Sequence, residues 1–256
     1  MMAHTLDIVV PFYNLGGYFK NSLTSLRQQT STDFAVWLVD DGSTDESLAL
    51  AKQAAAADDR FHVLTLPRHE GTSAARNAGV DAGTAPLVTF VDADDQVDPR
   101  FAATLIAGFQ EHQADIVAVG YTWGGGWFRR GGERSGRDRW QQIAKPDMLD
   151  QVTRHGTEVG GYIWNKGFSR AMLQAHHVTY DTRLTIAEDY LYATEAAAAG
   201  ESFWYNPVVL YTKINRPGST IHSRTWEMSR QEDEVFAEMA AIKQRALASD
   251  ANSASR

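Results

Sequence analysis

Short apolar runs alternate with helical patterns over the first 120 residues of the chain. The apolar runs are rich in β-branched and aromatic residues and lie at residues 6–10, 35–39, 61–66, 87–91 and 115–119. Between them, apolar residues recur at helical spacing, as at Phe19, Leu23 and Leu26. Strands that alternate with helices indicate βαβ units, so we predict an α/β fold with a mainly parallel sheet.

Two helices in this region have start signals. Ser43 and Glu46 are spaced as a capping box ahead of a helix over residues 46–57. Asp98 and Pro99 are typical of an N-cap and a first helical residue, and the helical pattern then runs to residue 112. We therefore expect helices to begin at these two points.

The pattern changes after residue 120. Residues 124–139 are rich in glycine and arginine and follow neither period, which predicts a mobile loop or a loose hairpin. Helical patterns follow at 146–154, 187–200 and 224–247, with a β-run at 208–212 between the last two. The polar residues 249–256 predict a disordered tail, so we expect a single domain over residues 1–248.

Composition narrows the classes of function. The formal net charge of −8 argues against a protein that coats nucleic acid, so we expect no nucleic-acid partner. The chain has no cysteine, which excludes disulfides and thiolate metal sites and fits a reducing cytoplasm. We expect neither a signal peptide nor a membrane-spanning helix, because no stretch approaches about 18 apolar residues, while peripheral membrane attachment stays open.

Polar residues follow three of the predicted strands at the points where the strands end. They are residues 11–14, 40–43 and 92–95. In an open α/β sheet, ligands bind beyond the carboxyl ends of the strands. The sequence therefore predicts that these three clusters form one binding site.

The third cluster contains three carboxylates within four positions, Asp92, Asp94 and Asp95. Carboxylates this close repel one another, so the strand either reaches the surface there or meets a cation. Mg²⁺ and Mn²⁺ prefer such oxygen ligands, and Asp92 and Asp94 point to the same side if the extended geometry continues. We interpret the cluster as a metal site, with His222 as a further ligand if it lies nearby; a surface turn and an ordinary histidine are the alternatives.

Other charged residues have two interpretations each. Asp40 and Asp41 could accept hydrogen bonds from a nucleoside base or ribose, or only favour the dipole of the next helix. Arg76 follows a glycine-containing helix start without the Walker pattern, and is either a surface charge or a contact to a phosphate or carboxylate. Glu188 and Asp189 begin a helix, where they either complement its dipole or supply a general base for an alcohol nucleophile.

Seven segments occur in a fixed order: "VPFYN", "VDDGSTD", "GTSAARNAG", "FVDADD", "WNKGFSR", "AEDYLY" and "YTKINRPGST". In this order the chain resembles the family 2 glycosyltransferases of the GT-A fold, in particular bacterial polysaccharide-type enzymes, over residues 6–220. The resemblance implies a Rossmann-like, mostly parallel sheet flanked by helices. It assigns residues 1–120 to the nucleotide sugar, 121–222 to the acceptor side and 223–248 to a C-terminal helix. Residues 124–139 match no motif of the family.

The resemblance also implies ligands and residue roles. The donor would be a nucleotide sugar, most often a UDP-sugar, with Mn²⁺ or Mg²⁺ bound at the Asp-x-Asp pair. Asp92 would contact the ribose or the metal, Asp94 would hold the metal, and Asp189 would be the catalytic base with Glu188 in support. The other residues implied at the nucleotide are Pro11, Tyr13 and Asp41 around the base, Asp40 nearby, Arg76, and Arg216 and Ser219 in a segment that closes on the phosphates.

The implied reaction is sugar transfer with inversion. Asp189 would take the proton of an acceptor hydroxyl that attacks the anomeric carbon from the face opposite the leaving group. The acceptor would be a sugar or a lipid-linked glycan, in cell-surface polysaccharide or glycoconjugate synthesis, in the cytoplasm or at the inner face of the membrane. A metal-dependent hydrolase of nucleotide sugars and a non-catalytic sugar-nucleotide binder would use the same residues.

Overall fold

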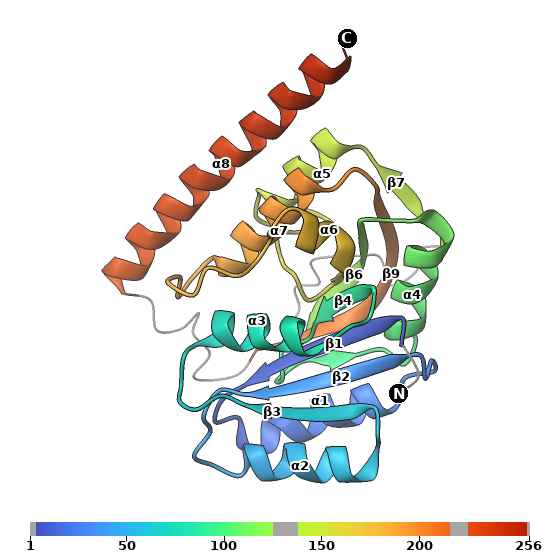
Figure 1. Ribbon diagram of the computed structural model, residues 1–256, viewed down its shortest axis with the longest axis vertical. Helices are drawn as coiled ribbons and strands as arrows, with labels where there is room; N and C mark the ends of the chain where they lie inside the picture. Colours follow the sequence, from blue (N-terminus) through green and yellow to red (C-terminus); the bar gives the residue numbers. More distant parts are fainter. Residues whose placement is uncertain (1–3, 125–137, 216–224, 255–256) are drawn as a thin grey trace.

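The computed structural model describes residues 4–124, 138–215 and 225–254, which form a nine-stranded sheet with helices on both faces (Figure 1). The strand order is β3-β2-β1-β4-β8-β6-β9-β5, and β7 pairs with β9. β1 lies between β2 and β4, so the first polar cluster of the sequence lies between the other two. This order brings the predicted site together.

The first four strands of that order run parallel. They are β3 (Phe61–Thr65), β2 (Phe34–Asp40), β1 (Leu6–Phe12) and β4 (Leu87–Phe90). All residues of β1 and β4 are buried, as expected for parallel strands covered on both faces. With β6 (Ile116–Gly124), all five strands predicted in the first 120 residues are confirmed.

The rest of the sheet is mixed. β8 (Lys166–Ser169) runs antiparallel to both β4 and β6, and β9 (Phe203–Ile214) runs parallel to β6. The short strands β5 (Gln96–Val97) and β7 (Gln141–Ile143) pair antiparallel with β9. β5, β7 and β8 were not predicted, because two to four residues are too few to show a strand period.

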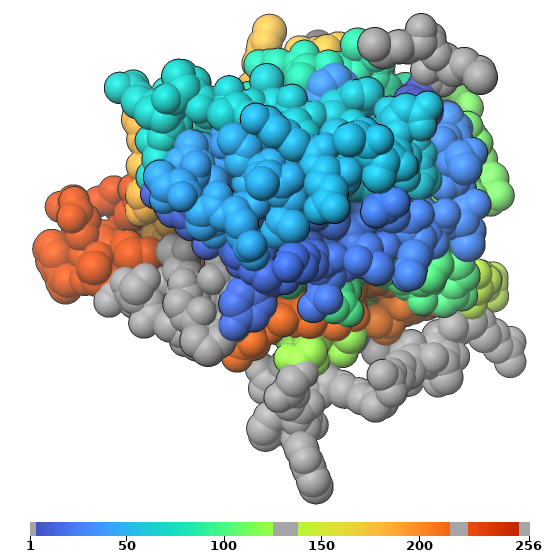
Figure 2. All heavy atoms as spheres, turned by 90° about the horizontal axis from the view of Figure 1, so that it is seen from below, coloured from blue at the N-terminus to red at the C-terminus, as the bar shows by residue number. Residues whose placement is uncertain are grey.

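Helices cover the sheet on both sides. Those of the first half are α1 (Phe19–Arg27), α2 (Ser47–Ala57), α3 (Thr72–Ala82) and α4 (Phe101–His112), with a 3₁₀ turn at Gly16–Tyr18. Those of the second half are α5 (Lys145–Val152), α6 (Arg170–Ala175), α7 (Glu188–Ala199) and α8 (Trp226–Ala254). α3 lies on one face of the parallel strands and α1 and α2 on the other (Figure 1). Figure 2 shows that the first half of the chain, in blue and cyan, forms a continuous surface over the middle of one face, with later parts of the chain at its edges.

The two helices begin one and two residues later than predicted, and the predicted caps do not form. α2 begins at Ser47, and the Ser43 hydroxyl accepts a hydrogen bond from the amide of Asn14 instead of capping the helix. α4 begins at Phe101, because the Asp98 carboxylate accepts the amide of Arg100 in a turn that precedes the helix. In both cases a polar side chain satisfies a nearby loop amide, which competes with capping.

The C-terminal helix is longer than predicted. α8 runs to Ala254, so the expectation of a disordered tail from residue 249 is wrong. Lys145 pairs with Asp250 at 3.6 Å, and Ala246 and Leu247 pack against the core, which favours the helix beyond its predicted end. Most of the glycine- and arginine-rich segment, residues 125–137, lies outside the described residues.

A single cluster of buried residues extends from β1 to β9 and joins the parallel and mixed parts of the sheet. A buried ion pair reinforces this junction: Arg170 in α6 donates to Asp7 in β1 at 2.8 Å. None of the described helices is both long and apolar enough to cross a membrane.

Candidate active site

The end of β2 carries two aspartates with different surroundings. Asp41 is buried and its two carboxylate oxygens accept the amides of Glu70 (2.7 Å) and Gly71 (2.9 Å). Asp40 accepts the amide of Ser43 through Oδ1 at 3.0 Å, while its buried Oδ2 has no hydrogen bond among the described residues. In this structure Asp41 therefore holds the loop before α3, and Asp40 has the unused acceptor.

An aromatic pair lies beside this turn. The ring of Tyr13, just after β1, stacks on that of His69 with centroids 4.0 Å apart and planes 18° apart. Asp41 fixes the histidine through Nδ1 at 2.8 Å. Tyr13 is exposed, whereas Pro11, two residues earlier, is buried within β1 opposite Val39. The sequence did not identify His69, whose only signal is its place in the loop after the third strand.

The acidic cluster forms a turn after β4. The strand ends at Phe90, and the amide of Asp95 donates to the carbonyl of Asp92 at 2.9 Å. Because the backbone turns here, the premise that put Asp92 and Asp94 on one side of an extended strand does not hold. Asp94 is half-buried, and within the described parts of the chain no three His, Asp or Glu side chains are grouped to hold a metal ion.

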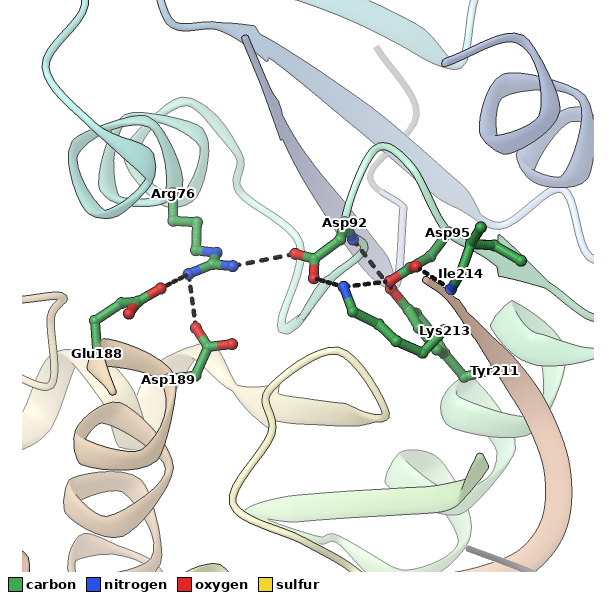
Figure 3. Close-up of polar contacts among 8 residues, drawn as sticks. All are labelled: Arg76, Asp92, Asp95, Glu188, Asp189, Tyr211, Lys213 and Ile214. Atoms are coloured by element: carbon green, nitrogen blue, oxygen red, sulfur yellow. Dashed lines mark hydrogen bonds and ion pairs between the residues drawn. The ribbon is translucent and has the colours of Figure 1, made fainter. Parts of the chain in front are cut away.

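The cations that this cluster meets are side chains of the protein (Figure 3). Asp92 accepts from Arg76 Nη2 at 3.1 Å through Oδ1 and from Lys213 Nζ at 2.7 Å through Oδ2. Burial alone would raise the pKa of Asp92, but Lys213 and Arg76 outweigh it and lower that pKa to about 2. Asp92 is thus ionised and both of its oxygens are engaged.

Asp95 is fully buried below this turn. It accepts from the Tyr211 hydroxyl (2.6 Å), the Lys213 ammonium (3.0 Å) and the amide of Ile214 (2.7 Å), all at the end of β9. Burial raises the pKa of Asp95 to about 7, against the attraction of Lys213. From the sequence, Asp95 was one of the three acids of the cluster without a role of its own. Tyr211 and Lys213 were not singled out, although both belong to the last of the seven segments.

Arg76 joins the acidic turn to the start of α7 (Figure 3). Its buried guanidinium donates through Nη1 to Asp189 Oδ1 at 2.6 Å and to Glu188 Oε1 at 3.1 Å, besides its bond to Asp92. The guanidinium also lies 5.2 Å from the centre of the Tyr180 ring. α3, β4 and α7 therefore converge on one arginine.

The two acids at the start of α7 follow Ala187, which has a left-handed backbone with φ of 60°. Such a conformation is strained for alanine and fixes the direction in which the helix starts. Burial raises the pKa of Asp189 to about 7 against the attraction of Arg76, and Glu188 and Asp92 add to the rise. Asp189 thus titrates near neutral pH while Asp92, on the same arginine, stays ionised, and such a pair of carboxylates is typical of general acid–base chemistry.

The structure therefore brings Arg76, Asp92, Glu188 and Asp189 into direct contact and places Asp94 on the same turn as Asp92. Pro11, Tyr13, Asp40 and Asp41 lie at the ends of the neighbouring strands. Arg216, Ser219 and His222 lie outside the described residues.

Comparison with known proteins gives matches over most of the chain. The family model described as "Glycosyl transferase family 2" matches residues 7–177. The uncharacterized glycosyltransferase EpsJ of Bacillus subtilis is 28% identical over 224 residues, which cover 85% of this chain and 63% of that protein. The chain thus spans about three fifths of the length of the first curated relatives that it matches.

Solved structures share the fold. Staphylococcus aureus TarS 1–349 in complex with UDP-GlcNAc matches with a TM-score of 0.77 and 21% identity, over 93% of this chain and 66% of that chain. The mannosyltransferase PcManGT from Pyrobaculum calidifontis, in complex with GDP-Man and Mn²⁺, matches with a TM-score of 0.61 and 17% identity, over 98% and 76% of the two chains.

Proposed function

The chain belongs to glycosyl transferase family 2 and has the GT-A fold, and from that premise we propose that it transfers a sugar, with inversion, from a UDP-sugar to an acceptor hydroxyl. The observation that carries this proposal is the contact of one buried arginine with both Asp92 and Asp189. It joins the acidic turn, on the side proposed for the donor, to a carboxylate suited to activate an acceptor.

Asp189 is the proposed base. A sugar hydroxyl is a weak nucleophile near neutral pH, and a positioned base contributes about 10²–10⁴-fold in rate. The raised pKa of Asp189, about 7, makes it a stronger base than an ordinary carboxylate. Arg76 fixes Oδ1 of Asp189 and Glu188 shares the same guanidinium, so both orient the base rather than take the proton.

The proposed nucleoside site lies at the ends of β1 and β2. The exposed Tyr13 ring, supported by His69, offers a surface on which a base can stack. Oδ2 of Asp40, which has no hydrogen bond within the described parts of the chain, can accept one from an N–H or O–H group. Asp41 supports this site through the loop it holds, and Pro11 by its place in β1. The UDP-GlcNAc complex of TarS supports uridine as the nucleoside.

We propose Asp94 as the protein ligand of a divalent cation. A half-buried carboxylate suits Mg²⁺ or Mn²⁺, which often bind one or two carboxylates together with substrate phosphates. Asp92 fits this role less well, because Arg76 and Lys213 already occupy its oxygens. When bound, the cation would neutralise charge on the diphosphate leaving group. The Mn²⁺ complex of PcManGT supports such a cation.

The test of transfer is release of UDP from UDP-sugars by the whole chain in Mg²⁺, with and without acceptor glycosides. A transferase releases UDP faster when the acceptor is present and forms a new glycoside. UDP release at one rate under both conditions, with free sugar as the product, would identify a hydrolase. UDP binding without any release would identify a non-catalytic binder.

A cytoplasmic location, peripheral attachment to the membrane and a lipid-linked glycan as acceptor remain proposals that this assay leaves open.

A further inference from the structure

Five aromatic side chains form a cluster beside the proposed base. They are Tyr121, Trp123, Tyr162, Trp164 and Tyr190. Tyr162 is the centre: its ring stacks on Trp164 with centroids 4.7 Å apart, and it meets Tyr121, Trp123 and Tyr190 at angles of 67° to 78°. Trp164 is buried, whereas Tyr162 and Trp123 are half-buried, so these two rings form the solvent side of the cluster.

The cluster touches both sides of the site. Trp164 stacks on Tyr211 with centroids 4.4 Å apart, and the Tyr211 hydroxyl donates to Asp95 in the acidic turn. At its other side, Tyr190 directly follows Asp189 in α7. The cluster therefore extends from the ring that contacts Tyr211, beside the acidic turn, to the residue next to the proposed base in α7.

The pairing of β6 with β9 places Trp123 on the side of the sheet where the acidic turn lies. Trp123 in β6 is the parallel partner of Lys213 in β9. Paired residues of neighbouring strands point to the same face of a sheet, and Lys213 reaches Asp92 on that face. Trp123 thus lies on the face of the sheet that carries the acidic turn.

Hydrogen bonds and close packing fix the backbone of residues 159–162. The buried Lys166 ammonium donates to the carbonyls of Val159 (3.0 Å), Gly160 (2.8 Å) and Tyr162 (2.5 Å). At Gly161 a Cβ atom would lie 2.1 Å from the Tyr190 ring, so only glycine fits this approach. Tyr162 is therefore presented by a fixed loop, as a preformed binding surface requires.

We propose that Tyr162 and Trp123 form a sugar-binding platform, on which a pyranose ring of the acceptor packs while one of its hydroxyl groups faces Asp189. This proposal rests on the function proposed above and adds the residues on which a sugar acceptor packs. The two rings have centroids 6.1 Å apart at an interplanar angle of 75°, which makes a corner for a ring-shaped ligand.

The chemistry of a pyranose fits such a corner. Several C–H groups on one face of a β-gluco- or β-galactopyranose form an apolar patch, and their partial positive charge is attracted to the negative face of an aromatic ring. Covering half-buried aromatic rings also removes apolar surface from water. The hydroxyl groups at the rim of the sugar stay free to reach a base.

The test is saturation-transfer NMR of three probes: methyl β-D-glucopyranoside, methyl β-D-galactopyranoside and methyl N-acetyl-β-D-glucosaminide. Each is added to the whole chain with UDP and Mg²⁺, and again without them. We expect at least one probe to bind, with the strongest saturation at the C–H protons of one ring face.

Tyr162→Leu and Trp123→Leu, which keep apolar bulk and lose the ring, should weaken binding about threefold to tenfold, the effect of an aromatic pair. Tyr162→Phe should bind as the wild type does.

Trp204→Leu is the matched control. Trp204 is half-buried in the same strand as Lys213 but pairs with Val117 near the start of β6 and stacks on His112. Its loss should leave probe binding unchanged. If no probe binds the wild type, or if the Tyr162 and Trp123 variants bind as well as the wild type, the platform is wrong. UDP affinity, measured by calorimetry on the same samples, tests the proposed donor separately. If the probes bind but UDP does not, the proposal of a UDP-sugar donor is wrong and the sugar-binding platform stands.

Discussion

Arg76 arranges the charges of the site at the scale of single residues. Its guanidinium contacts three carboxylates, and a buried charge of this kind is stable only when it is paired. Asp92 pairs with a second cation, Lys213, and its pKa falls to about 2. Among the described residues Asp189 pairs with Arg76, and burial outweighs the attraction of Arg76 and of the more distant Lys213 and raises its pKa to about 7. One arginine thus joins an ionised carboxylate to one that titrates near neutral pH.

Lys213→Met should destabilise the protein strongly. The substitution leaves Asp92 and Asp95 without the ammonium that they share, and loss of one partner of a buried ion pair costs about 3–5 kcal/mol. Urea unfolding at pH 7 measures the loss. The double variant Lys213→Met/Asp95→Asn should recover part of it, because the second change removes one of the unpaired charges.

Lys243→Met is the control for this prediction. Lys243 pairs with the exposed Asp150 on the surface of α5, where water screens an ion pair, so its loss should change the free energy of unfolding little. Equal losses for the Lys213 and Lys243 variants would show that Lys213 has no special role in holding the acidic turn.

Asp94→Asn should weaken UDP binding in Mg²⁺ and leave the weaker binding in EDTA unchanged. Asp94 is the one carboxylate of the acidic turn that we propose as a metal ligand, and an amide is a poorer ligand for a hard cation. Calorimetric titration with UDP under the two conditions measures the difference. Equal affinity of the wild type in Mg²⁺ and in EDTA would contradict a metal at this position.

Three elements that are distant in sequence bring charged side chains to the acidic turn after β4. α3 brings Arg76, the start of α7 brings Glu188 and Asp189, and the end of β9 brings Lys213. The position of Arg76 depends on how closely α3 approaches the sheet. Gly79 permits this approach, because a Cβ atom there would lie 2.4 Å from Val9 Cγ1 and 3.1 Å from Val39 Cγ2.

Gly79→Ala should therefore lower the free energy of unfolding by about 1–3 kcal/mol, the cost of overpacking a filled core. The helix must shift away from β1, which also displaces Arg76 one turn earlier. Urea unfolding measures the loss, and Gly17→Ala is the control, since nothing lies within 4 Å of a Cβ atom at Gly17. A Gly79→Ala variant within about 0.5 kcal/mol of the wild type, the range of ordinary surface changes, would contradict this packing argument.

The elements that the sequence predicted correctly have local signals. β1, β2, β3, β4 and β6 were found because each coincides with a short run rich in β-branched, aromatic and other apolar residues. β5 and β8 owe their structure to pairing with distant strands, so their own residues show no period. The turn at residues 92–95 was not predicted for the same reason. Hydrogen bonds from Tyr211, Lys213 and Ile214 hold Asp95 in place, and these residues lie at least 116 positions away in the sequence.

At the scale of the whole molecule, one core joins the parallel strands to the mixed part of the sheet. This continuity lets residues 113 positions apart, Arg76 and Asp189, meet at 2.6 Å. The sequence indicated that both belong to one site, through the order of the seven segments, but not that they touch. The sequence left open whether the three acids reach the surface or meet a cation, and favoured a metal ion. That Arg76 and Lys213 are cations for Asp92 could be recognised only from the fold.

The role of Asp189 as the base is decided by turnover across pH. We expect wild-type turnover to rise as pH increases through about 7, because Asp189 can accept a proton only in its ionised form and burial raises its pKa to about 7. Asp189→Asn keeps the size of the side chain and removes its basicity. It should lower turnover by about 10²–10⁴-fold and leave the affinity for UDP nearly unchanged, as calorimetry on the same sample will show. A variant that keeps more than about a tenth of wild-type turnover, well outside that range, or that keeps the same rise with pH, would contradict Asp189 as the base and make Glu188 the next candidate.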